Sequence, residues 1–171
     1  MELLDVYNDE GVPTGRVVQR GTPNEEFKKG EHIGIAQIYI QNFKGEFLVE
    51  KSSKTTGYRY LPVSGHILSG EAPIDAIIRE TKEEIGLDLT KEEIGDVGFF
   101  VIDFPVRFIY YIKKNINLDD LYLQKEEVES VSYMSASEMM YLSANGMMHP
   151  VHRELIPKVA NYALKNMKKF K

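Results

Sequence analysis

The sequence of 171 residues contains no cysteine and no tryptophan. The lack of cysteine excludes disulfides, thiolate metal sites and a cysteine nucleophile. No apolar run is long enough to cross a bilayer, and the first residues, MELLDVYNDEG, lack the basic and apolar segments of an export signal. We therefore predict a cytoplasmic protein that has no membrane partner.

Positive charge is also scarce, with 21 Lys and Arg residues against 26 Asp and Glu residues and a formal net charge of −5. This balance provides no basic surface for long nucleic acid. A small phosphorylated substrate remains compatible with it, because such a ligand needs only local cations and a metal ion. Hydrophobic residues make up 43% of the chain and charged residues 27%, which predicts one globular domain over residues 1–171.

One segment, GHILSGEAPIDAIIRETKEEIGL at residues 65–87, places acidic groups at helical spacing. Residues three and four apart are neighbours on a helix, so Glu80, Glu83 and Glu84 project from one face. Their mutual repulsion costs roughly 0.2–0.5 kcal/mol per pair, and a bound cation removes that cost. We expect Mg²⁺ or Mn²⁺ as the cofactor, because these hard cations prefer carboxylate and water ligands.

Hydrophobic periodicity predicts the secondary structure along the chain. We expect an N-terminal hairpin over about residues 3–20 and strands near 32–42, 46–52, 97–104, 106–115 and 126–135, with a short strand near Tyr60 and Val63. The helix of the acidic segment should begin near Ala72 and end at Gly86. Two further helices are expected, over 135–145 and about 150–170. This mixture predicts an α/β fold with helices on both faces of the sheet.

The acidic segment resembles the signature of Nudix hydrolases, G-x5-E-x7-R-E-U-x-E-E-x-G-U, where U is a bulky aliphatic residue. Eight residues of this chain fall in register with it: Gly65, Glu71, Arg79, Glu80, Glu83, Glu84, Gly86 and Leu87. Thr81 departs from an aliphatic position, so we expect slightly weaker packing of the helix stripe formed by Ala72, Ala76, Ile77 and Thr81. The resemblance implies a single Nudix hydrolase domain, folded as an α/β/α sandwich with a mixed β-sheet and the N-terminal hairpin.

The resemblance also implies a role for each box residue. Glu80 and Glu84 are the expected principal metal ligands, Glu83 completes the cluster directly or through water, and the Gly65 carbonyl is placed to bind the same ion. Arg79 is expected to orient the carboxylates through an ion pair, with Glu71 or Glu83 as its partner. Gly86 is expected to end the helix.

The activity implied by this family is divalent-metal-dependent hydrolysis of a pyrophosphate bond in a nucleoside diphosphate linked to another moiety. The catalytic base is expected to be Glu83 or Glu80, or else Glu127 in a late loop, where many family members carry an acid. The region before the box borders the substrate pocket in relatives, so Tyr58, Arg59, Tyr60 and His66 are candidate contacts to a small-molecule diphosphate.

A looser resemblance covers residues 3–135 and points to the Nudix subgroup related to isopentenyl diphosphate isomerase. In true isomerases, histidines at the positions of His32 and His66 bind a metal. Those enzymes also require an active-site cysteine and alter the arginine–glutamate pair, whereas this chain has no cysteine and keeps Arg79 and Glu80. An isomerase-like prenyl diphosphate enzyme and a non-catalytic binding module remain the alternatives.

Two further expectations concern the surface. His149 and His152 lie near the C-terminal helix without an acidic partner in register, so both are expected at the surface. The N-terminal hairpin is a candidate contact for a homodimer.

Overall fold

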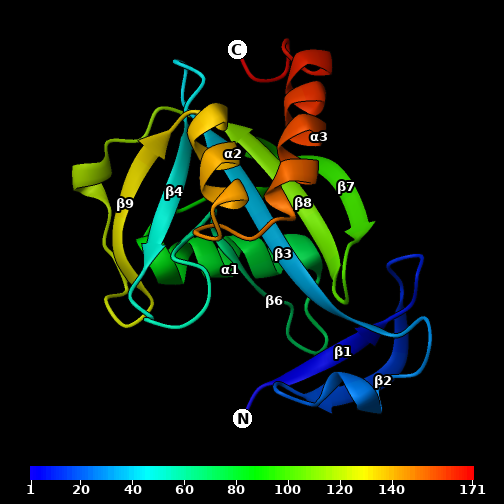
Figure 1. Ribbon diagram of the computed structural model, residues 1–171. Coiled ribbons are helices and arrows are strands. Elements are labelled where there is room, and N and C mark those ends of the chain that lie inside the picture. The colour runs from blue at the N-terminus through cyan, green and yellow to red at the C-terminus, as the bar shows by residue number, and fades with distance from the viewer.

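The computed structural model describes residues 1–171 and contains a strongly curled mixed β-sheet (Figure 1). The long strand β3, His32–Gln41, is its centre: it pairs in parallel with β8 and antiparallel with β1 and β6. The other strands are β1 Leu3–Tyr7, β2 Pro13–Gln19, β4 Phe47–Ser52, β5 Tyr60–Leu61, β6 Ser64–His66, β7 Gly95–Val101, β8 Val106–Lys113 and β9 Val128–Met134.

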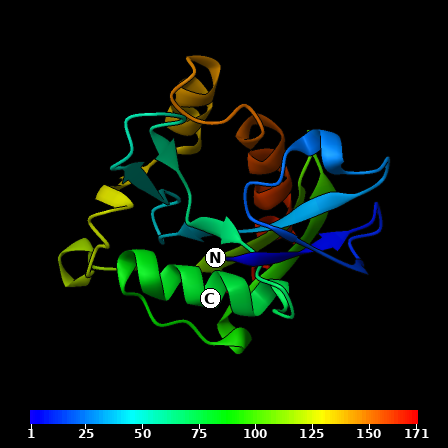
Figure 2. The same cartoon turned by 90° about the horizontal axis from the view of Figure 1, so that it is seen from below.

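Three α-helices cover the two faces of the sheet, α1 Pro73–Ile85 on one side and α2 Ala136–Ala144 with α3 His152–Lys165 on the other (Figures 1 and 2). Alternation along β8 produces this layering, because Tyr110 and Ile112 belong to the core on the α1 side while Ile109 and Tyr111 belong to the core beneath α3. The predicted α/β class with helices on both faces is therefore confirmed. None of the helices has the length and apolarity needed to cross a membrane.

The N-terminal hairpin of β1 and β2 lies at one end of the sheet (Figure 1) and is fastened to the segment that carries the acids. Val6 of β1 pairs with Ile33 of β3. The Asp5 carboxylate accepts hydrogen bonds from the Ser69 hydroxyl at 2.8 Å and from the Gly70 amide at 2.9 Å. The hairpin and the loop before α1 are thus held in a fixed relation.

Helix α1 begins after Ala72 with Pro73 in its first position and ends at Gly86, whose φ of 71° is the left-handed conformation that favours glycine. Ala72 itself is exposed, so the prediction that it belongs to the apolar stripe is wrong. Thr81 is fully buried, and its hydroxyl donates to the Ile77 carbonyl at 2.7 Å. The polar atom at this aliphatic position is therefore satisfied within the helix.

Two expectations about the C-terminal region are wrong. Helix α3 ends at Lys165, short of about residue 170, and the chain then turns so that the Phe170 ring packs against Tyr111, 5.0 Å between centroids. His152 is buried, with 1% exposed, because the first turn of α3 packs against the sheet. Its Nδ1 lies 2.6 Å from the Tyr39 hydroxyl.

Candidate functional site

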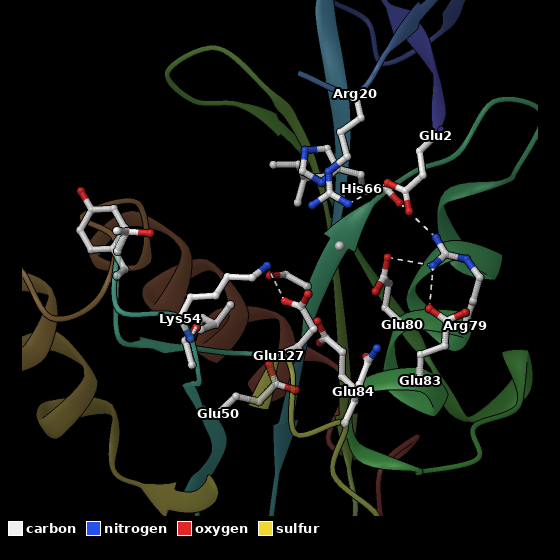
Figure 3. A pocket seen from close by; sticks show the side chains of 18 residues that line it. Glu2, Arg20, Glu50, Lys54, His66, Arg79, Glu80, Glu83, Glu84 and Glu127 are labelled. Atoms are coloured by element: carbon white, nitrogen blue, oxygen red, sulfur yellow. Dashed lines mark hydrogen bonds and ion pairs between the residues drawn. The ribbon is translucent and has the colours of Figure 1, made fainter. Parts of the chain in front are cut away.

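A polar cavity of about 360 Å³ opens between α1, β4, β6, the end of the hairpin and the loop before β9 (Figure 3). Carboxylates dominate its lining, and they come from four separate parts of the chain. The acidic residues are Glu2, Glu50, Glu80, Glu83, Glu84 and Glu127, and the basic ones are Arg20, Lys54, His66 and Arg79. The structure therefore gathers Glu80, Glu83 and Glu84 of the helix, the Gly65 backbone and Glu127 around one space.

Arg79 organises the α1 side of this cavity. Its Nε and Nη2 donate to the two oxygens of Glu71 at 2.8 and 3.0 Å, while Nη1 donates to Glu80 at 2.9 Å and to Glu83 at 3.2 Å. Nη2 also donates to the His66 carbonyl at 3.1 Å, so all five N–H groups have acceptors. These bonds raise the pKa of Arg79. Arg79 is thus a structural cation with no donor left for a ligand.

Gly65 brings the backbone of β6 against the helix. A Cβ built on Gly65 would lie 2.1 Å from Cδ of Glu80, a distance that no side chain tolerates. Only glycine lets the strand and the Glu80 carboxylate approach this closely. Burial raises the pKa of Glu80, and the hydrogen bond from Arg79 opposes that shift.

Glu50 is a site residue that sequence reasoning missed. It comes from β4, is 2% exposed, and lies within hydrogen-bonding reach of Glu84. Burial raises the pKa of both carboxyls, and for Glu84 the nearby charges of Glu50 and Glu80 raise it further. Glu50 Oε1 and Glu84 Oε2 are buried and have no hydrogen-bond partner.

A signal for Glu50 was present in the sequence. It follows Phe47, Leu48 and Val49 in an apolar strand, and alternation places it on the face of Leu48, which packs on the α1 side. A glutamate on the buried face of a strand calls for a partner. What that partner is, however, depends on α1, more than 20 positions away in the chain.

Glu127 lies across the cavity from α1. Its carboxylate forms an ion pair of 2.5 Å with Lys54, which follows β4, and its backbone carbonyl accepts from the Ser53 amide at 2.9 Å. The loop before β9 is therefore held against the segment after β4. This contact places an acid from a late loop in the same cavity as Glu80, Glu83 and Glu84.

The candidate substrate contacts divide into two groups. Tyr58 and His66 line the cavity, whereas Arg59 and Tyr60 do not. Arg59 donates to the Lys54 carbonyl at 2.7 Å and to Glu129 at 2.9 Å, and Tyr60 packs in the core on the α3 side. Burial lowers the pKa of His66 to about 4, which keeps its ring neutral near pH 7.

Two cationic side chains, Arg20 and Lys54, line the cavity and form no ion pair with the acids of α1. The sequence analysis did not identify either of them. Arg20 follows β2 and bonds Glu2 at 2.7 Å across the hairpin. His32 lies apart from this space: its ring nitrogens bond Asp9 and the Phe104 carbonyl, each at 2.7 Å. His32 therefore joins the hairpin, β3 and the β7–β8 turn.

The donor set fits a hard divalent cation. No three acidic or histidine side chains already converge as a complete ligand set, and Arg79 bonds both Glu80 and Glu83. Two buried carboxylate oxygens nevertheless lack any partner, and a hard cation is the kind of ligand that such oxygens suit. Mg²⁺ typically takes one or two carboxylates and completes its shell with waters and substrate phosphates. The residues present therefore suit Mg²⁺ or Mn²⁺.

Comparison with known proteins settles the family, since the sequence model of the NUDIX domain matches residues 31–159. This chain belongs to the Nudix family of hydrolases. The Nudix box is thus the segment 65–87, and the resemblance drawn from its spacing is confirmed. The hairpin residues Glu2 and Arg20 lie outside the matched region but inside the cavity.

Individual relatives agree with this assignment. An uncharacterized Nudix hydrolase of Listeria monocytogenes is 32% identical over 152 residues, which cover 85% of this chain and 87% of that protein. The isopentenyl-diphosphate Delta-isomerase of Corynebacterium diphtheriae is 23% identical over 156 residues, 82% of each chain. A crystal structure from Deinococcus radiodurans shares the fold at a TM-score of 0.75 and 15% identity, covering 92% of this chain and 99% of its own.

Proposed function

We propose that this Nudix hydrolase uses Mg²⁺ or Mn²⁺ to hydrolyse the pyrophosphate bond of a nucleoside diphosphate linked to another moiety. One observation carries the proposal: buried carboxylates with unpartnered oxygens line the same cavity as Arg20 and Lys54. Such a cavity provides oxygen ligands for a cation and separate positive charges for phosphate groups. A diphosphate bridged to the metal needs both.

The box residues would hold the ion. Glu80, Glu83 and Glu84 supply carboxylates from α1, and the carbonyl of Gly65 supplies a backbone oxygen. The bound metal supplies neutralisation of phosphate charge and a lowered pKa for water. Arg79 keeps Glu80 and Glu83 in position. The cation would therefore bind to carboxylates whose orientation this arginine has already fixed.

The base must reach the attacking water from the open side of the cavity. Glu84 is held beside Glu50 and is poorly placed for that task. Glu127 and Glu83 are more open, with side-chain exposures of 38% and 52%. We assign the base to Glu127, with Glu83 and Glu80 as the alternatives, because Lys54 can transfer its contact from Glu127 to a substrate phosphate.

A substrate panel tests the activity. Nucleoside diphosphate sugars, dinucleotides, coenzyme A and prenyl diphosphates would be incubated with Mg²⁺ and with Mn²⁺, and released monophosphate would be measured. We expect cleavage of at least one nucleotide-linked diphosphate, abolished by a chelator. Tight binding of such compounds without any cleavage would favour a non-catalytic binding module.

The variant Glu84→Gln tests the site itself. Loss of this carboxylate should lower turnover by orders of magnitude, about 10²-fold or more, because the metal loses a ligand. The circular dichroism spectrum should stay unchanged. Turnover equal to that of the unmodified enzyme would remove Glu84 from the mechanism.

Prenyl diphosphate isomerisation is a second candidate only because of the similarity to the Corynebacterium isomerase. The chain has no cysteine and keeps Arg79 bonded to Glu80, so both departures from true isomerases persist in the structure. Incubation with isopentenyl diphosphate and detection of its allylic isomer would establish this alternative.

A further inference from the structure

The side chain of Glu50 on strand β4 is directed toward α1, the helix of the Nudix box. Leu48 and Glu50 lie two residues apart and so face the same side of the sheet, where Leu48 joins the core beneath α1. Main-chain pairing fixes this orientation, because Glu50 is in register with Leu61 of β5 and with Val131 of β9. Glu50 therefore cannot turn away from α1 without breaking the centre of this sheet region.

The surroundings leave Glu50 incompletely satisfied. Its side chain is buried, its Oε1 has no hydrogen-bond partner, and its carboxyl faces that of Glu84, whose Oε2 is also unpartnered. No arginine or lysine forms an ion pair with either carboxylate, whereas Glu80 and Glu83 share Arg79 and Glu127 has Lys54. Two buried acids with free oxygens are costly unless a cation or a shared proton lies between them.

We propose that Glu50 is a metal ligand, and that the primary divalent-cation site is the pair formed by Glu50 of β4 and Glu84 of α1. This inference rests on the metal dependence proposed above and adds a ligand from outside the Nudix box. The site then bridges sheet and helix. Glu80 and Glu83 contribute to it once some of their hydrogen bonds with Arg79 are broken. Waters and substrate phosphates complete the shell of the ion.

Binding of Mn²⁺ alone, in the absence of substrate, tests the assignment. Free Mn²⁺ would be followed by electron paramagnetic resonance during titration of the protein and of Glu50→Gln, which keeps the shape of the side chain but removes its charge. We expect about tenfold or greater weakening in Glu50→Gln, comparable to the loss in Glu84→Gln. The rise in melting temperature on adding Mn²⁺ should shrink in parallel.

The matched control is Glu129→Gln. Glu129 lies on the neighbouring strand β9, pairs with Lys51 and Arg59, and does not line the cavity, so its Mn²⁺ affinity should stay unchanged. If Glu50→Gln does not fold, Glu50→Asp carries the same test, because it withdraws the carboxylate by one methylene. Unweakened Mn²⁺ binding in the folded variant would overturn the assignment. Failure to cleave any diphosphate would refute the proposed function alone.

Discussion

At the scale of single residues, the side chains that decide how the protein responds to pH are ionisable groups buried away from water. His152 is one that lies far from the Nudix box, and burial, with a smaller contribution from the charge of Arg107, lowers its pKa to about 3. Its neutral ring is hydrogen-bonded to the Tyr39 hydroxyl, whose pKa is raised by burial. The native state therefore holds His152 unprotonated through the mildly acidic range.

The neutral state of buried His152 predicts that the folded protein loses stability in mild acid. Above pH 6.5 the ring is neutral in both native and unfolded chains, but below that value the unfolded chain binds a proton that the native one refuses. His152 should thus remove about 2 kcal/mol of stability between pH 7 and pH 5. His152→Gln, which can still form a hydrogen bond with Tyr39, should lose less stability over that interval in urea unfolding. An equal loss in both proteins would show that His152 does not cause it.

At the scale of elements, the loop–helix–loop of the Nudix box depends on two glycines for different reasons. Gly65 makes room for the Glu80 carboxylate, whereas Gly86 takes the left-handed conformation that ends α1. The first is a matter of function and the second of stability. Alanine substitutions should separate the two.

Gly65→Ala should damage the site more than the fold. Its Cβ would overlap Glu80, so that carboxylate must leave its contact with Arg79. We expect about tenfold or greater loss of turnover with a nearly unchanged melting temperature. Full activity would mean that the position of Glu80 does not matter for catalysis.

Gly86→Ala should show the opposite pattern. A Cβ at a φ of 71° is strained, and it would lie 3.0 Å from the Tyr122 carbonyl oxygen, which is backbone and cannot rotate aside. We expect a loss of about 1 kcal/mol or more in the free energy of unfolding. Turnover per folded molecule should be retained, and measuring both quantities on the same preparation checks the contrast.

At the scale of the whole molecule, the cavity joins parts that are distant in the chain. The hairpin end, β4, the box helix and the loop before β9 each contribute acids. Leu48 of β4 packs with Ile77 and Ile85 of α1 in one core, and the amide of Gln124, before β9, donates to the Glu84 carbonyl. A cation bound among the carboxylates would add a further link between these parts.

Divalent metal should consequently stabilise the folded protein. A ligand present at 100 times its dissociation constant adds about 2.7 kcal/mol, or several degrees in melting temperature for a chain of this size. Calorimetry with Mg²⁺ should show this rise, EDTA should reverse it, and the rise should be smaller in Glu84→Gln. A melting temperature indifferent to Mg²⁺ and Mn²⁺ would contradict metal binding at this site.

Much of the architecture could be predicted because it follows from local pattern. Alternation in β3 and β8, Pro73 at the start of α1 and Gly86 at its end each act within a few residues, and the structure has the elements there. Predictions were weaker where a side chain's environment comes from elsewhere in the chain. Arg59 bonds Glu129 instead of lining the cavity. His152 is buried by the packing of α3, which the residues next to it in the sequence do not indicate.

The sequence by itself determined the chemistry: the register of Gly65, Arg79 and the helix acids, together with the lack of cysteine, specified an oxygen-rich Nudix box before any fold was known. Helical periodicity alone places those acids on one face. Only the tertiary structure decided that Glu50 faces Glu84 and that Arg20 reaches the cavity. The physical reason is that these relations arise from strand pairing and packing between segments far apart in the chain, which no local spacing encodes.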